Sequence, residues 1–315
     1  MFLMINKWWK NNFPEIEEKK VKSLLHRFNA EGYKGYAINP YLGCQHRCVY
    51  CYATYEWFPD FYDKIYVKIN SEEILKNEIP LYGTDYPIMI ASSTDPYQPV
   101  EIKYRNTRKI LSVLEKYKAQ YFIFTKSSII KLDLDIHERN KERCWIIWSL
   151  TTLNEELKRK IEPFTSSAKK ILETLKLFSE KGIRCGINID PIIPFLTDNK
   201  EELYQIVKLS KENGAKFISA GILRIRKDIW FRIKNFLVEI QRKDLVKKYY
   251  ELYFIKGRKE NGYLISDENY SNYVLKILER FCKKEGINFG FPFEIPNLET
   301  SQCYILNQYK ITDYF

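Results

Sequence analysis

Short apolar runs alternate with longer amphipathic stretches along much of the chain. Six apolar runs have the length and composition of buried strands. They lie at 36–39, 87–91, 120–125, 144–149, 184–190 and 217–222. The stretches between several of them repeat apolar residues every three or four positions, which is typical of helices. One predicted helix begins at Ser71, and three others cover 107–117, 167–181 and 199–213.

Strands that alternate with helices predict a parallel sheet with helical crossovers. Six strands are too few for an eight-fold barrel but suit an open, partial one, so the predicted fold class is α/β. After Arg224 the pattern changes, because long helical stretches at 229–253 and 270–284 precede an irregular tail at 288–315. We therefore expect three parts. They are an N-terminal extension (1–35), a partial barrel (36–225) and a mainly helical or irregular C-terminal cap (226–315).

The composition is that of a folded globular protein, with 45% apolar and 29% charged residues. No run of about 18 apolar residues appears, so we expect no transmembrane helix. The N-terminus lacks the layout of a secretory signal. These features lead us to expect a cytoplasmic protein that does not associate with membranes, while its oligomeric state stays open.

Lysine and arginine outnumber aspartate and glutamate by 51 to 40, which gives a net charge of +11. Such a surplus favours an anionic partner, nucleic acid above all, through neutralisation of phosphates. The alternative is a lysine-rich surface without a partner, because the basic residues are spread along the chain. The charge alone leaves both interpretations open.

Seven cysteines divide into a cluster of three and four scattered residues. An odd number in a chain without a signal argues for reduced thiols and against a disulfide framework. The three clustered residues, Cys44, Cys48 and Cys51, directly follow a predicted strand. A short loop of this kind lets three thiolates converge on a [4Fe–4S] cluster, with one iron left free for a small molecule. Structural zinc completed by His46 or a remote cysteine is the alternative, although zinc sites typically use paired cysteine spacings.

The cysteine loop, NPYLGCQHRCVYCYA, resembles the hallmark C-x3-C-x2-C motif of the radical S-adenosylmethionine (SAM) superfamily. The longer match is similar to the spore photoproduct lyase-related branch, which includes proteins called DNA repair photolyases. Further segments resemble that branch in the same order. They are ASSTDPYQPVE (91–101), TKSS (125–128), SLTT (149–152), IEPFTSSAKKIL (161–172) and INIDPIIPFLTDN (187–199).

The resemblance implies a partial (β/α)6 barrel in which SAM binds the open iron of a [4Fe–4S] cluster. One electron, from a donor such as ferredoxin or flavodoxin, cleaves SAM to methionine and a 5′-deoxyadenosyl radical. That radical abstracts a hydrogen atom from the substrate. The cofactor supplies the difficult chemistry, while the protein orients and shields it.

The resemblance also places the cofactor-binding residues, because ligands bind outside the carboxyl ends of parallel strands. The candidates are Ser92, Ser93, Thr94, Asp95, Lys126, Ser149, Thr151, Glu162, Lys170, Asp190 and Arg224. Lys170 departs from the arginine that is more usual in the family. For Glu162 and Lys170 the alternative is an acidic helix cap and a solvated helix lysine, and Arg224 has a solvent-facing alternative too.

Two tyrosines flank the third cysteine, and the candidate catalytic residues are therefore Tyr50 and Tyr52. They would act as a radical relay, with packing around the cluster as the alternative. The family's lyase carries a hydrogen-donor cysteine near the strand that corresponds to 88–94, where this chain has only serines. Lyase chemistry with that relay is therefore not expected. Cys144 and Cys185 begin their strands, away from the site, and we expect both to be core thiols.

Three functions remain open from the sequence. The first is a radical SAM enzyme that acts on a nucleic-acid base, in repair or modification. The second is a radical SAM enzyme that acts on a protein, a peptide or a small metabolite. The third is a non-catalytic scaffold that binds a cluster or zinc.

Overall fold

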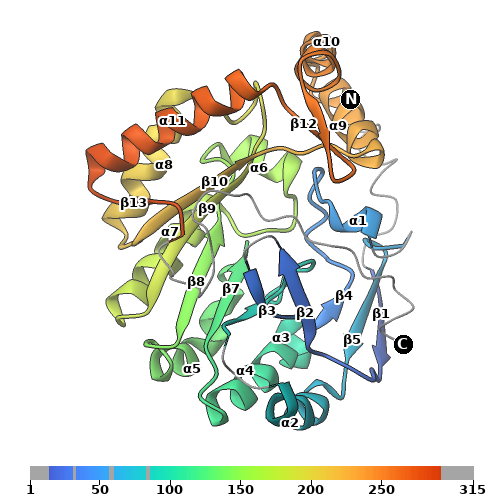
Figure 1. The fold of residues 1–315 in the computed structure, drawn as a ribbon, viewed down its shortest axis with the longest axis vertical. Coiled ribbons are helices and arrows are strands. Elements are labelled where there is room, and N and C mark those ends of the chain that lie inside the picture. The colour runs from blue at the N-terminus through green and yellow to red at the C-terminus, as the bar shows by residue number, and fades with distance from the viewer. Residues whose placement is uncertain (1–13, 31–32, 57–59, 83–85, 292–315) are drawn as a thin grey trace.

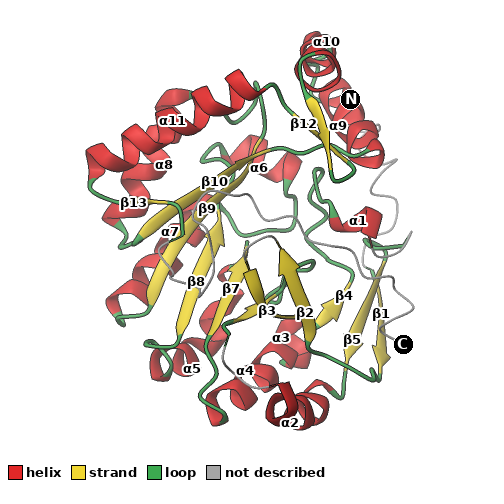
Figure 2. Cartoon of the chain, viewed as in Figure 1, coloured by secondary structure: helices red, strands yellow, loops and turns green. Residues whose placement is uncertain are grey.

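The computed structural model describes residues 14–30, 33–56, 60–82 and 86–291. Its main sheet contains six parallel strands. They are β3 (Tyr33–Ile38), β6 (Ile88–Ile90), β7 (Tyr121–Thr125), β8 (Cys144–Ser149), β9 (Arg184–Ile192) and β10 (Phe217–Ile222). The strand order in the described residues is β13-β10-β9-β8-β7-β6-β3-β2 (Figures 1 and 2). This α/β arrangement confirms the predicted open, partial barrel.

Two strands extend the sheet at its edges. β2 (His26–Ala30) pairs antiparallel with β3, and β13 (Asn288–Phe289) pairs parallel with β10. Neither was predicted from the sequence, because each is short and gains its order by pairing with a strand already in place. They bring both the N-terminal and the C-terminal parts of the chain into one sheet.

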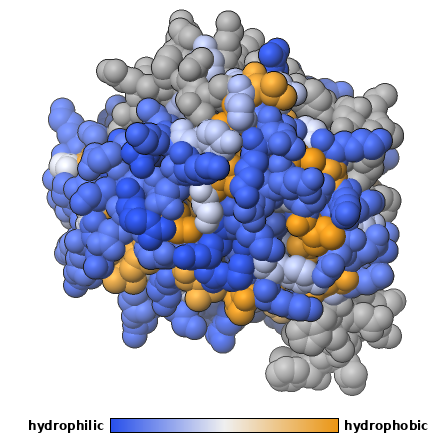
Figure 3. All heavy atoms as spheres, turned by 90° about the horizontal axis from the view of Figure 1, so that it is seen from below, coloured by the Kyte–Doolittle hydropathy of each residue, from blue (hydrophilic) through white to orange (hydrophobic). Residues whose placement is uncertain are grey.

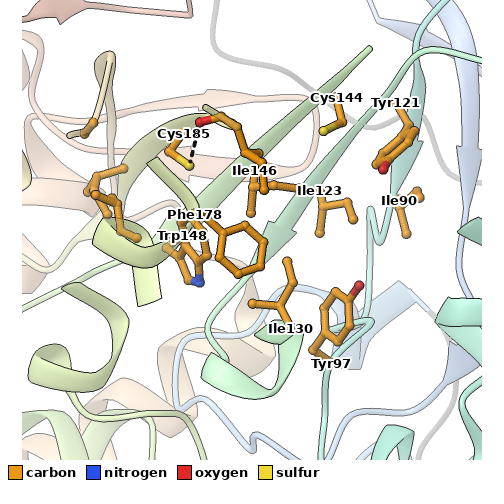
Figure 4. Packing of buried hydrophobic residues seen from close by; sticks show 14 of the residues in the cluster. Ile90, Tyr97, Tyr121, Ile123, Ile130, Cys144, Ile146, Trp148, Phe178 and Cys185 are labelled. Carbon is orange, nitrogen blue, oxygen red and sulfur yellow. Dashed lines mark hydrogen bonds between the residues drawn. The ribbon is translucent and has the colours of Figure 1, made fainter. Parts of the chain in front are cut away.

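The central strands are apolar throughout because both of their faces are buried. In β8, Ile146 and Trp148 face the helical layer, while Ile147 belongs to a separate cluster with Phe122 and Phe217. Figure 4 shows Trp148 close to Phe178 of the covering helix α7. The crossover helices on this side are α2 (Ser71–Tyr82), α4 (Asn106–Lys116), α5 (Leu134–Arg139), α7 (Ala168–Glu180), α8 (Lys200–Glu212) and α11 (Glu268–Glu285).

A smaller sheet lies beside the first crossover. It contains β1 (Glu15–Lys19), β5 (Lys64–Lys68) and β4 (Tyr41–Leu42). Short helical segments complete this part and the next connections. They are α1 (Ala53–Glu56), α3 (Glu101–Tyr104), the 3-10 helix Ser128–Asp133 and α6 (Glu155–Ile161).

The C-terminal part is mainly helical, as expected, and the helical stretch predicted over 229–253 is divided into several elements. The structure has α9 (Lys227–Glu239), α10 (Asp244–Tyr250) and a π-helical turn (Glu251–Ile255). The break lies at Gln241, which adopts a φ of 63°. The hairpin β11 (Arg258–Glu260) and β12 (Tyr263–Ile265) then precedes α11. Most of the tail predicted to be irregular, with Cys303, lies outside the described residues.

The described part of the face seen in Figure 3 is largely hydrophilic, with small, scattered apolar areas. Scattered apolar side chains of this kind are ordinary on a protein surface. Among the described residues, no helix combines the length and the apolar character that a membrane crossing requires.

Candidate active site

The cysteine loop leaves the sheet after β3 and makes a close approach to β5. Gly43 has a φ of +80°, and a Cβ atom there would lie 2.2 Å from the carbonyl oxygen of Lys64. Only glycine satisfies both requirements. The amide of Cys44 then donates to the carbonyl of Phe61 at 3.1 Å, which fixes the first cysteine.

The other two cysteines follow within a tight turn, in which the amide of Cys51 donates to the carbonyl of Cys48 at 3.1 Å. Cys44 and Cys48 are buried, and Cys51 is half-buried. Burial raises the pKa of all three thiols, and nearby negative charge raises the pKa further, from Asp95 and then Cys51 at Cys44, and from Glu162 and then the other two sulfurs at Cys48. The free thiols therefore keep their protons at neutral pH, and a metal that binds them displaces those protons.

Three soft sulfur donors on one short loop fit an iron–sulfur cluster. Among the described residues, no group of three or more His, Cys, Asp and Glu side chains, the three cysteines included, is already arranged around a single metal ion. The candidate zinc ligand His46 instead contacts Asp95, with 3.4 Å between Nδ1 and Oδ2.

The stretch after β6 braces this loop through two glutamines. Gln98 accepts from the amide of Gln45 at 2.9 Å, and its side-chain amide donates to the carbonyl of Gly43 at 3.1 Å. Gln45 in turn accepts from the amide of Val100 at 2.6 Å. These bonds explain why the second resembling segment accompanies the cysteine motif.

The serines that follow β6 are held by the residue that follows β3. Asn39 donates to the Ser92 hydroxyl at 3.0 Å and accepts from the amide of Ser93 at 3.1 Å. Thr94 is buried and donates to the carbonyl of Tyr41 at 3.3 Å. The candidate residues Ser92, Ser93 and Thr94 therefore lie directly beside the start of the cysteine loop.

Asp95 connects the ends of β6 and β7. Its carboxylate accepts from the amide of Tyr97 at 2.8 Å, from the Thr125 hydroxyl at 2.8 Å and from the amide of Lys126 at 2.7 Å. Burial acts to raise the pKa of this carboxyl, but His46 and the backbone donors outweigh burial and lower it. Since its oxygens already have partners within the protein, Asp95 positions the loops around the site.

Glu162 is the centre of a buried polar network. Its carboxylate lies 3.2 Å from Nζ of Lys126, accepts from Thr151 at 2.6 Å and also contacts Lys158 and Tyr50. Burial acts to raise the pKa of Glu162, but the two ammonium groups outweigh it and hold that pKa well below its usual range. Glu162 in turn raises the pKa of Lys126 against the opposing effect of burial. Both groups therefore stay charged, with Lys126 at the carboxyl end of β7.

The candidate catalytic tyrosines each have a hydrogen-bond partner. The buried Tyr50 hydroxyl contacts Glu162 and lies 3.3 Å from the Thr151 hydroxyl. Tyr52 donates to the carbonyl of Ser92, and this contact joins the cysteine loop to the end of β6.

The other predicted residues lie on or after further elements. Ser149 ends β8 and is buried, and Asp190 lies near the end of β9, where a Cβ at Gly221 would come within 2.9 Å of its carboxylate. Arg224 follows β10, with its guanidinium 5.4 Å from the ring centre of Tyr263. Lys170 is exposed on α7, so Lys126 and Lys158 are the basic partners of Glu162 instead.

Several residues of the site were not predicted from the sequence. Lys158 had a usable signal, since it precedes Glu162 by four residues on a helical stretch. Gln98 lay inside a resembling segment. Tyr62 and Arg232 had no local signal, because their contacts to the cysteine loop arise from the packing of β5 and α9.

Comparisons with known proteins agree with this geometry. The sequence profile of the Radical SAM superfamily matches residues 38–210. An uncharacterised protein of Methanocaldococcus jannaschii is 36% identical over 196 residues, which cover 60% of this chain and 71% of that protein.

Solved structures share the fold. A spore photoproduct lyase with bound AdoMet and dinucleoside spore photoproduct has a TM-score of 0.66 at 17% identity, covering 87% of this chain and 81% of that one. SuiB of Streptococcus suis, bound to S-adenosylmethionine, has a TM-score of 0.51 at 16% identity, covering 92% of this chain and 54% of that one.

The profile covers more than half of the chain, and it spans the cysteine loop and the strand ends described above. SAM and a [4Fe–4S] cluster are the cofactors of this family. The chain therefore belongs to the radical SAM superfamily and is an enzyme of that class.

Proposed function

We propose that this radical SAM enzyme acts on a nucleic-acid base, and that Cys44, Cys48 and Cys51 hold its cluster. The observation that carries the choice of substrate is an exposed row of aromatic side chains within a basic stretch of the chain. The shared fold with spore photoproduct lyase, which was solved with a dinucleoside lesion, supports the same choice.

The aromatic row consists of Trp230 on α9, Tyr250 at the end of α10 and Phe254 in the π-helical turn. The rings of Tyr250 and Phe254 are stacked, with centroids 5.0 Å apart and an interplanar angle of 10°, and Trp230 lies 5.3 Å from Phe254. Tyr250 and Phe254 are 51% and 39% exposed, and the adjacent Ile255 is 65% exposed. Exposed aromatic faces are the platforms on which unpaired bases stack.

Positive charge surrounds this row. Residues 227–260 carry ten lysines and arginines against five acids, so 34 residues hold +5 of the net charge of +11. Helical spacing places Lys234 on the side of Trp230 and Lys247 on the side of Tyr250. Four of the acids pair with basic residues of the same segment, namely Asp228 with Arg232, Asp244 with Arg242, Glu251 with Lys256 and Glu260 with Arg258, which leaves the lysines near the row without these carboxylates. A polyanion that stacks its bases on the row would therefore meet lysines along its backbone.

The aromatic row belongs to the unit that contacts the cysteine loop. Arg232, on the same helix as Trp230, donates to the carbonyl of Cys51 at 2.6 Å. In Figure 1, α9 lies beside the segment that leads to α1, which follows the cysteines directly. A strand bound along the row would therefore lie on the same C-terminal unit that contacts the cysteine loop.

The cluster and SAM, when bound, supply the electron transfer and the 5′-deoxyadenosyl radical. The chain's own residues orient SAM and shield it from water. The ammonium of Lys126 is charged and lies at the carboxyl end of β7, where a carboxylate of the cofactor would find a cation. Ser92, Ser93 and Thr94 offer backbone and hydroxyl groups at the neighbouring strand end. Glu162 holds Lys126 in place at 3.2 Å.

The proposed reaction does not use a hydrogen-donor cysteine at the position where the family's lyase has one. The segment 88–94 contains no cysteine. Cys144 and Cys185 are buried near the amino ends of β8 and β9, at the edge of the sheet opposite the site. The proposed reaction is therefore a repair or modification of a base without a thiol relay from these positions.

The first test measures binding of fluorescently labelled single-stranded oligonucleotides, DNA and RNA, by anisotropy at several salt concentrations. We expect affinity that falls steeply with salt, and a loss of about fivefold to a hundredfold for Phe254→Ala, as expected for one lost stacking contact. Tyr273→Ala is the matched control, since Tyr273 is 53% exposed on α11, away from the row. No binding at low salt would reject a nucleic-acid substrate.

The second test follows 5′-deoxyadenosine by chromatography after anaerobic reconstitution with iron and sulfide, reduction by dithionite and addition of SAM. We expect production in the wild type and none in Cys48→Ala, with Cys144→Ala as a control that keeps the activity. Stimulation by an oligonucleotide would identify the substrate class. Full activity and iron content in Cys48→Ala would contradict the proposed ligands.

A further inference from the structure

Arg232 connects the C-terminal helix α9 to the cysteine loop. Its Nη2 donates to the carbonyl of Cys51 at 2.6 Å, and its Nη1 donates to the hydroxyl of Tyr62 at 3.0 Å. The side chain is only 15% exposed. Hydrogen bonds from a guanidinium are strong and directional, so this contact fixes the end of the loop.

Tyr62 continues the chain of donors to a second cysteine. Its hydroxyl accepts from Arg232 and donates to the carbonyl of Cys48 at 2.6 Å. The charge on the guanidinium polarises the hydroxyl, which strengthens the second bond. The carbonyls of two proposed cluster ligands are therefore bonded, directly or through one hydroxyl, to a single positive charge.

The carboxylate of Asp228, also on α9, lies against the guanidinium of Arg232. Asp228 lies 2.9 Å from Nη2 of Arg232 and also accepts from the Thr54 hydroxyl at 3.1 Å. The Thr54 hydroxyl lies 3.1 Å from the carbonyl of Cys51 as well, and its single proton serves one of these two acceptors at a time, so the carboxylate is one side chain away from the loop. The carbonyl of Cys51 therefore has the guanidinium of Arg232 in direct contact and the carboxylate of Asp228 one side chain away.

We propose that Arg232, Tyr62 and Asp228 are positioning residues that set the reduction potential of the cluster. One-electron reduction adds a negative charge to the cluster, which a nearby cation stabilises and a nearby anion destabilises. Neighbours of the ligands tune a metal site in this way in other proteins. The inference rests on the proposed cluster ligands and does not depend on the substrate.

The experiment is a redox titration of the reconstituted protein, with the reduced cluster measured by electron paramagnetic resonance. We expect Arg232→Gln to reduce the equilibrium constant for reduction about tenfold, which is about 59 mV to lower potential for one electron. Asp228→Asn should shift the potential in the opposite direction. Arg232→Lys keeps the charge and should show a smaller decrease.

Electrostatic tuning predicts potential shifts of opposite sign in Arg232→Gln and Asp228→Asn. A role in packing alone would shift the potential of both variants in the same direction. Arg242→Gln is the control, because Arg242 is an exposed arginine whose pair with Asp244 lies outside these contacts. Unchanged potentials in Arg232→Gln and Asp228→Asn would overturn the inference, as would shifts of the same sign. Iron and sulfide content in the wild type tests the ligands separately, and oligonucleotide binding tests the substrate.

Discussion

Glu162 combines two properties that rarely occur together, complete burial and a lasting charge. Its side chain is 0% exposed, and it lies against the ammonium groups of Lys126 and Lys158. Removal of one member of such a group leaves the opposite charge buried without compensation, which costs more than the group contributes as a whole. The carboxylate therefore holds both lysines and the Tyr50 side of the cysteine loop in place.

We expect Glu162→Gln to lower the free energy of unfolding by about 3 to 5 kcal/mol, because two ammonium groups lose their buried counter-charge. Urea unfolding at pH 7 measures this change. Glu156→Gln is the matched control on the same helix, since Glu156 is 74% exposed and pairs with Lys160 at 2.7 Å. The control should change stability by less than about 1 kcal/mol. Equal losses in the two variants would contradict the assigned role.

The helix α7 is fixed to two neighbouring elements through one buried side chain. Phe178 is fully buried and meets Trp148 of β8 edge to face, with centroids 5.3 Å apart and an angle of 89° (Figure 4). It also lies 5.7 Å from the ring of His137. This one side chain therefore connects the helix to the sheet and to α5.

We expect Phe178→Ala to lower the free energy of unfolding by about 3 to 5 kcal/mol, through lost burial and the cavity that remains. Lys176→Ala on the exposed side of α7 should stay within about 0.5 kcal/mol. Thermal or urea unfolding of the two variants gives the comparison. A loss below 1 kcal/mol for Phe178→Ala would mean that neighbouring side chains refill the space.

Elements with a strong local pattern were predictable from the sequence. The runs CWIIWS and FISAGI match β8 and β10 at both ends, because both faces of these strands are buried. The break between α9 and α10 was not predictable, since apolar spacing continues through it and the turn depends on the φ of Gln241. A backbone reversal of this kind leaves no gap in the hydrophobic pattern.

The sequence predicted those site residues whose positions depend only on the parallel arrangement of the strands. Parallel strands bring their carboxyl ends to one edge, so Asp95 and Lys126 were expected together and lie together. Resemblance indicated both Glu162 and Lys170, but Lys170 is exposed on α7, and the cations beside Glu162 are Lys126 and Lys158. The contact of Arg232 with Cys51 joins residues 181 positions apart, and only the docking of α9 creates it. Such long-range contacts have no period or spacing in the sequence.

At the scale of the whole molecule, buried titratable groups make stability depend on pH. His137 is fully buried between two tyrosines, with its ring nitrogens 3.0 Å from the hydroxyls of Tyr97 and Tyr121. Burial lowers its pKa to about 3. His26 has a pKa lowered to about 3 as well, by burial first and then by the charge of Lys68. Both imidazoles are therefore neutral in the folded protein at mildly acidic pH.

The unfolded chain protonates these histidines near pH 6.5, whereas the folded protein does not until about pH 3. Between these values the unfolded state binds more protons, so stability is present above pH 6.5 and is lost as the pH falls. We expect the difference in unfolding free energy between wild type and His137→Gln to shrink by roughly 1.5 kcal/mol from pH 6.5 to 5. The contribution of His26 is common to both proteins and cancels. Parallel stability curves, measured by urea unfolding at each pH, would mean that His137 binds a proton in the folded state.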